Sequence, residues 1–131
     1  MVIETYSSDT CIALSEKTFR ALVTPVPFMV YAGRYTTARL TQMGFDLMPD
    51  LVNHRADFNL EKQTGEFGDR LVDFVRDGDE SVAAMKTQSF EQTKQRCQQA
   101  ANHNQQLLAK MKSAWAVDFA QWWPQVLEKI K

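Results

Sequence analysis

Cysteine is scarce in this sequence of 131 residues, which has only Cys11 and Cys97, far apart. Two cysteines are too few for a disulfide framework or for a zinc site built from cysteine alone. We expect both to be small, buried, free thiols in a reducing compartment. No apolar run approaches the ~20 residues that a membrane-spanning helix needs. The N-terminus also lacks a basic region followed by an apolar one, so a cytoplasmic location is expected.

The chain also has no excess of charge of one sign. It contains 15 basic and 16 acidic residues, and its net charge is -1. No overall field therefore draws the chain to nucleic acid or to an anionic membrane. The C-terminal part carries several cations, but glutamines dilute them and no aromatic residues alternate with them on the same face. We interpret them as a solvated face rather than a nucleic-acid site. They are Lys86, Lys94, Arg96, Lys110 and Lys112.

The usual catalytic and metal-binding motifs are missing as well. There is no Walker loop, no GxGxxG fingerprint and no Gly-x-Ser-x-Gly elbow. His54 and His103 have no ligand-like spacing, so we expect no metal ion and no cofactor. His54 would suit acid–base chemistry, although a surface histidine is the favoured interpretation. The acidic run 77–80 is predicted to be a solvated turn between helices, and the catalytic residues stay unknown.

The sequence predicts a single domain over residues 1–131, with a core over 1–54 and a helical extension over 55–131. In the core we expect a strand at 2–6, a helix from the cap Ser15 to about Val23, and a strand ending at Tyr31. A helix at 35–43, stopped by Gly44, and a strand at 45–48 follow. This β-α-β-α-β order predicts an α/β fold with a small parallel sheet of about three strands.

The extension is predicted to consist of helices and to contain no strands. Helices are expected at 60–76 and from Glu80 to about Met85, with a break at 77–79 between them. The clearest helix begins at Phe90, where apolar residues recur at helical spacing. Pro124 should kink or end this helix. A sheet of three strands has exposed edges unless another chain or the helical extension covers them, which favours self-association or a protein partner.

One candidate site lies at the start of the first helix. Ser15, Glu16 and Lys17 are followed by a predicted strand, and Lys17 opposes the helix dipole unless an anion binds there. Gly33 and Arg34 follow that strand and would let a phosphate approach. Glu4 ends the first strand, where a carboxylate is placed to accept hydrogen bonds from a ribose. Each of these also has an ordinary structural interpretation as a surface or turn residue.

A second candidate site is aromatic. Core packing is the first interpretation of the three tryptophans near the C-terminus, and the alternative is a docking surface, because aromatic residues dominate the strongest contacts of protein interfaces. The candidate interface residues are Trp115, Phe119, Trp122 and Trp123.

Several segments together resemble a known group of proteins. They are Ser15-Glu16-Lys17-Thr18-Phe19, Pro27-Phe28-Met29-Val30, Gly44-Phe45-Asp46-Leu47-Met48, Asp50-Leu51-Val52-Asn53-His54 and His103-Asn104. This pattern resembles phage and giant-virus proteins related to glycosyltransferases, and the Glu-Lys pair is similar to one in the nucleotide-sugar half of fucosyltransferase-like enzymes. The chain departs from the pattern at Ser15, where threonine is usual, and at Arg55-Ala56-Asp57, where Ser-Tyr-Asp is common.

The resemblance implies a nucleotide-sugar binding module, with Lys17 on the diphosphate and Glu16 and Glu4 on ribose or sugar hydroxyls. Its relatives carry a longer upstream region, so transfer activity would need a partner chain or self-association. The ligand would be a nucleoside diphosphate sugar, and a viral protein would act in the host cytoplasm. The alternative prediction is a non-catalytic, phage-encoded interaction protein that binds a host or viral protein through its Trp-rich helical face.

Overall fold

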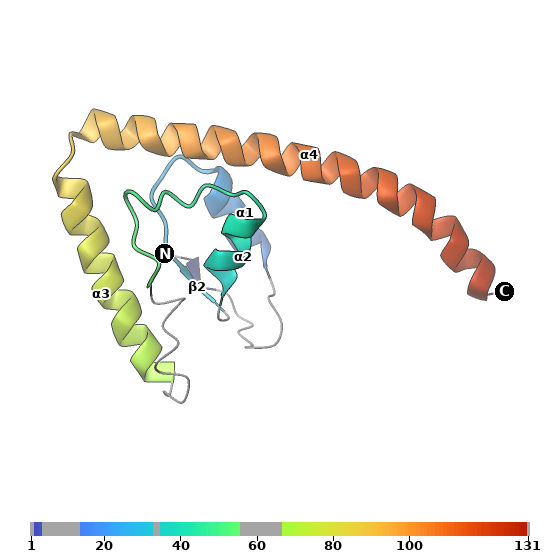
Figure 1. The fold of residues 1–131 in the computed structure, drawn as a ribbon, viewed down its shortest axis with the longest axis horizontal. Helices are drawn as coiled ribbons and strands as arrows, with labels where there is room; N and C mark the ends of the chain where they lie inside the picture. Colours follow the sequence, from blue (N-terminus) through green and yellow to red (C-terminus); the bar gives the residue numbers. More distant parts are fainter. Residues whose placement is uncertain (1, 4–13, 33–34, 56–66, 131) are drawn as a thin grey trace.

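The computed structural model describes residues 2–3, 14–32, 35–55 and 67–130, and the side chains of residues 14–32, 35–55 and 71–117. Helices α3 and α4 form two sides of the molecule, and the shorter elements lie between them (Figure 1). The order is β1 (Val2–Ile3), α1 (Glu16–Val23), β2 (Val30–Tyr31), α2 (Thr36–Gln42), α3 (Phe67–Lys86) and α4 (Phe90–Ile130).

The predicted α/β fold is wrong, because the described residues are mostly helical. The strands present among them are the two-residue segments β1 and β2, which pair in parallel with Val2 opposite Val30 and Ile3 opposite Tyr31. The expected strand at 45–48 does not form. The Phe45 N–H donates to the Leu40 carbonyl at 3.0 Å, and the Asp46 N–H donates to Asn104 Oδ1 at 2.8 Å. These donors are therefore not free to join a sheet.

The first two helices follow their local signals. Ser15 caps α1, since its Oγ accepts a hydrogen bond from the Lys17 N–H at 3.2 Å. α2 ends at Gln42, and Gly44, two residues later, has a φ of 93°. The Gly44 N–H donates to the Thr41 carbonyl at 2.9 Å, and the next N–H reaches back to Leu40, which is a Schellman arrangement. These two boundaries were predictable because neighbouring residues set them.

The predicted break at 77–79 is also wrong, because α3 runs without interruption through Gly78. The helix packs closely on the segment before and within β2. A Cβ at residue 78 would lie 3.6 Å from the sulfur of Met29, and the rings of Phe74 and Tyr31 meet edge to face with centroids 5.2 Å apart. This packing supports the helix where its own sequence is weak.

Helix α4 is the longest element and also the main cover of the core. Ser89 and Gln92 form a capping box at its start, with reciprocal hydrogen bonds of 2.9 and 3.2 Å. Of the two outcomes predicted at Pro124, the end of the helix is wrong, because α4 continues to Ile130. The helix instead curves in its C-terminal part (Figure 1). Cys97 and Ala100 are buried against Leu22, Leu40 and other core residues, and their small side chains let α4 approach closely.

Candidate interaction surface

The structure describes three of the residues predicted to bind an anion. Ser15 is occupied in capping α1, and the exposed Glu16 forms an ion pair with Arg20 at 3.9 Å on the same helix. Lys17 is exposed, and the three pockets described below are lined by other residues. Glu4, Gly33 and Arg34 lie outside the described residues. Nucleotide-sugar binding therefore stays a prediction, although the three-stranded sheet on which it depended is not formed.

A buried amide fixes the middle of α4 to the rest of the molecule. Asn104 is 0% exposed. Its Oδ1 accepts from the Asp46 N–H at 2.8 Å, and its Nδ2 donates to the carbonyls of Leu22 and Asp46 at 2.9 and 3.0 Å. One side chain thus satisfies three backbone groups from two separate segments, which would otherwise be buried without partners. This side chain sets the position of α4 along the core.

A charged cluster fixes the same helix two turns earlier. Arg96 donates to both oxygens of Asp46 at 2.8 and 2.9 Å and to both oxygens of Asp50 at 2.7 to 3.1 Å. The hydrogen bonds from Arg96 lower the pKa of Asp46, while the two carboxylates raise the pKa of Arg96. The interpretation of Arg96 as part of a solvated face is therefore wrong.

Two further polar contacts complete the attachment of α4. His103 Nε2 lies 2.8 Å from the Gly44 carbonyl, so this nitrogen is the donor, and Gln105 Nε2 donates to the Val23 carbonyl at 3.0 Å. The described part of the chain contains no group of three His, Cys, Asp or Glu side chains placed to hold a metal ion. Arg96, His103, Asn104 and Gln105 thus have a structural role, which is to hold α4 on the segments that it covers.

The C-terminal part of α4 has a different environment. We call residues 112–130 the distal segment and the rest of the described structure the body. The body ends beneath Met111, which is half-buried against the core, whereas every side chain from Lys112 to Val117 is exposed. The distal segment extends beyond the body with no other described element beside it (Figure 1). At 1.5 Å per residue it is about 28 Å long.

Trp115 lies at the base of the distal segment and is 57% exposed, and Val117 is 55% exposed. Trp115 follows Met111 by four residues, so it lies on the face of α4 that packs on the body, one turn further on. Phe119, Trp122 and Trp123 continue α4, but their side chains lie outside those described. Of the candidate interface residues, Trp115 is thus placed on an exposed part of the helix.

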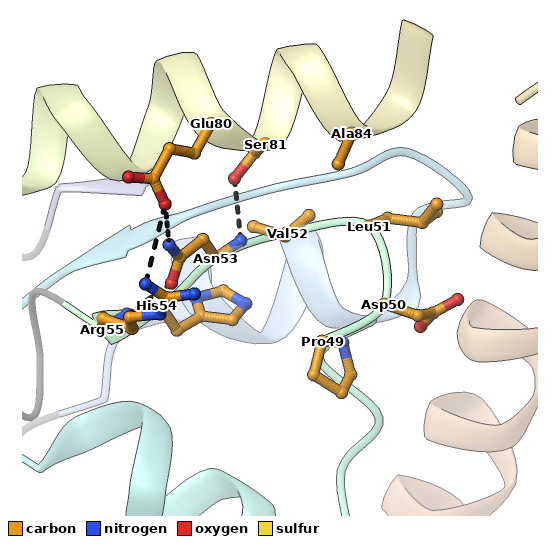
Figure 2. A pocket seen from close by; sticks show the side chains of 10 residues that line it. All are labelled: Pro49, Asp50, Leu51, Val52, Asn53, His54, Arg55, Glu80, Ser81 and Ala84. Carbon is orange, nitrogen blue, oxygen red and sulfur yellow. Dashed lines mark hydrogen bonds and ion pairs between the residues drawn. The ribbon is translucent and has the colours of Figure 1, made fainter. Parts of the chain in front are cut away.

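A pocket of about 400 Å³ lies between residues 49–55 and α3 (Figure 2). Its polar groups mostly bind one another. The Asn53 N–H donates to Ser81 Oγ and the Asn53 side chain to Glu80, both at 2.7 Å, while Ser81 Oγ donates to the Asp77 carbonyl at 2.6 Å. Arg55 forms a weaker ion pair with Glu80 at 3.9 Å. These bonds join the loop to α3, and sequence reasoning missed them because 27 or 28 residues separate the partners.

Two smaller pockets flank this one. A pocket of about 270 Å³ between residues 27–29 and α3 is mainly apolar and includes Val75 and Val82, which are also exposed. Another of about 300 Å³ lies between α2 and residues 45–49 and shares His54 with the pocket of about 400 Å³. His54 Nε2 lies 3.0 Å from the Leu47 carbonyl, and this hydrogen bond fixes the orientation of the imidazole ring. His54 thus lines two neighbouring pockets.

No family model matches the chain, and neither a curated protein nor a solved structure matches it. The resemblance to glycosyltransferase relatives therefore also stays a prediction. Within the described residues, no helix is both long enough and apolar enough to span a membrane.

Proposed function

We propose that this chain is an interaction protein that binds another helix through the distal segment of α4. The observation that carries the proposal is the exposure of Trp115 and Val117 on a helix that continues beyond the body. Aromatic residues dominate the strongest contacts of protein interfaces, and large exposed ones are the usual anchors. The partner that fits is an apolar helical face, because an isolated helix is covered most completely by another helix.

Helix stability supports the same proposal. The distal segment gains no tertiary packing from the described body, and most helical stability in proteins comes from such packing. The body fixes α4 through Arg96 and Asn104, but these contacts end two turns or more before the distal segment. A partner helix would supply the missing packing. Full burial of one large apolar side chain contributes about 1.5–3 kcal/mol, so a few such side chains are enough for a stable complex.

Tryptophan fluorescence tests the proposal directly, because the three tryptophans of the chain are Trp115, Trp122 and Trp123. All of them belong to the distal segment, so the emission reports on this region alone. In the dilute, unbound chain we expect an emission maximum typical of exposed indole and efficient quenching by acrylamide. Addition of the partner should shift the emission to the blue and reduce the quenching. A dilute monomer whose three tryptophans are all shielded would overturn the proposal, since the distal segment would then already be covered.

A further inference from the structure

We infer that the pocket between residues 49–55 and α3 binds a free α-amino acid with an apolar side chain. This site is separate from the distal segment, so the inference goes beyond the function proposed above. The volume of the pocket, about 400 Å³, lies at the lower end of the range of about 300–1,000 Å³ that small-molecule sites occupy. The size therefore fits one small ligand.

Two opposite charges line this pocket from its two sides. Arg55 belongs to the loop and Glu80 to α3, and Figure 2 shows the contact between the guanidinium and the carboxylate. The distance from Arg55 Nη1 to Glu80 Oε2 is 3.9 Å, which is too long for a hydrogen bond. The two groups attract one another but keep hydrogen-bonding capacity that a ligand can use.

Asn53 fixes the positions of both charged residues. Its Oδ1 accepts from the Arg55 N–H at 3.0 Å, and its Nδ2 donates to Glu80 Oε2 at 2.7 Å. The Asn53 N–H also donates to Ser81 Oγ on α3 at 2.7 Å. These bonds hold the loop on α3 without help from the long ion pair. A ligand can therefore bind both charges while the loop stays attached, which lowers the cost of ordering the site.

The two charges select the polar part of the ligand. A guanidinium binds a carboxylate through two parallel N–H donors, and a carboxylate accepts hydrogen bonds from an ammonium group. An α-amino acid carries its carboxylate and its ammonium group on the same carbon, so it suits two charges that lie 3.9 Å apart. A phosphate ester fits less well, because Glu80 would repel it.

The rest of the lining selects an apolar side chain. Most of the surface of the pocket is apolar, and burial of apolar surface favours binding. The apolar lining residues are Pro49, Leu51, Val52 and Ala84. Asp50 also lines the pocket, but its carboxylate is bound to Arg96 at 2.7 Å. Arg55 and Glu80 are thus the charged groups that this pocket offers to a ligand.

The test is an NMR titration of the isotope-labelled full chain with three matched compounds. They are L-leucine, L-leucinamide, which lacks the carboxylate, and N-acetyl-L-leucine, which lacks the ammonium group. We expect leucine to shift the backbone amide signals of residues 49–55 and 80–84 in a saturable way. Each of the other two compounds should bind about fivefold more weakly, because each loses one ion pair.

Arg55→Gln and Glu80→Gln assign each charge to its partner. In Arg55→Gln, leucine and leucinamide should bind with nearly the same dissociation constant, because the partner of the carboxylate is gone. In Glu80→Gln, leucine and N-acetyl-leucine should become equivalent, while the new side chain still accepts from Asn53. The matched control is Arg20→Gln, which breaks an exposed ion pair of the same length, 3.9 Å to Glu16, outside the pocket. The spectra also show whether each variant is folded.

Three results would overturn the inference. Amide signals that stay unchanged up to the solubility limit of leucine would mean that the pocket does not take this class of ligand. Equal binding of the three compounds would mean that the apolar lining alone attracts them. An equal loss of binding in Arg20→Gln would mean that the charges act from a distance and form no site. None of these results affects the function proposed for the distal segment, because the tryptophans that test it lie on α4.

Discussion

At the scale of single residues, Asn104 is the side chain on which the position of α4 depends most. Asn104→Ala removes three hydrogen bonds and leaves the backbone groups of Leu22 and Asp46 buried without partners. Each unsatisfied buried group costs about 1–3 kcal/mol, so we expect a loss of roughly 3 kcal/mol or more in the free energy of unfolding. Urea denaturation of the variant measures this directly.

The control for Asn104 is another asparagine of the same helix. Asn102 is exposed and its side chain contacts Gln98 on the surface at 2.8 Å. Asn102→Ala should change the free energy of unfolding by less than about 0.5 kcal/mol. Equal effects of the two substitutions would mean that helix propensity, and not the buried amide, accounts for the result.

The pairing of Asp46 with Arg96 makes stability depend on pH. The pKa of Asp46 is lower in the folded chain than its ordinary value of 3.8, mainly because Arg96 donates to the carboxylate. The unfolded chain therefore binds more protons in acid, so this stabilisation is present above the unfolded pKa and is lost as the pH falls through the folded pKa. We expect the free energy of unfolding to change little from pH 7 to 5 through this group and to fall below about pH 4.

Arg96→Gln checks the cause of this pH dependence. The variant removes the cation but keeps a hydrogen-bonding side chain, so the pKa of Asp46 should return toward its ordinary value. Carboxyl carbon chemical shifts, followed during a pH titration of both proteins by NMR, measure it. An unchanged pKa of Asp46 in Arg96→Gln would mean that its backbone hydrogen bond to Met48 dominates instead.

At the scale of elements, boundaries set by adjacent residues were predictable and those set by distant ones were not. Ser15 and Gly44 mark helix ends through bonds to residues two to four positions away. The strand expected at 45–48 failed because Asn104, 58 positions further along, takes the Asp46 N–H. Strand propensity depends strongly on context, so a tertiary hydrogen bond can prevent a strand from forming even where the residues favour one. Nothing near Asp46 in the sequence signals this bond.

The same distinction applies to the candidate site. The helical spacing of apolar residues predicted α4 and drew attention to Trp115, which the structure places on an exposed surface. That spacing carries no information about where the body ends, so it could not separate a core tryptophan from an interface tryptophan. The bonds from Arg96 to Asp46 and Asp50 were missed for a similar reason, since they join residues 46 and 50 positions apart.

Two glycines provide a paired test of the element boundaries. Gly78 lies inside α3, where a Cβ would meet the Met29 sulfur at 3.6 Å, an ordinary contact. Gly78→Ala should therefore stabilise the chain by about 0.5–1 kcal/mol, because alanine favours the helix and restricts the unfolded chain. Gly44 has a φ of 93°, so Gly44→Ala should destabilise by about 1 kcal/mol or more.

Thermal unfolding of these two variants separates the effects, since the same substitution is expected to have opposite signs. A lower melting temperature for Gly78→Ala would mean that α3 is bent or strained at this glycine. A neutral Gly44→Ala would mean that the end of α2 relaxes without its left-handed residue.

At the scale of the whole molecule, the chain divides into a body with its own core and a distal segment without one. Trp115→Ala tests this division because it removes apolar surface that the body does not bury. The free energy of unfolding of the monomer should change by less than about 0.5 kcal/mol. The dissociation constant of the complex with the partner helix should rise at least tenfold, as expected for a truncated aromatic anchor.

Phe90→Ala is the matched control for Trp115→Ala. Phe90 is 77% exposed at the other end of α4, so it is an aromatic residue on the same helix that is more exposed than Trp115 and far from the distal segment. Its removal should leave both the monomer stability and the dissociation constant nearly unchanged. If Phe90→Ala weakens the complex as much as Trp115→Ala, the contact with the partner extends to the start of α4 and is not confined to the distal segment. If neither variant affects it, exposure of aromatic residues on α4 does not mark the interface.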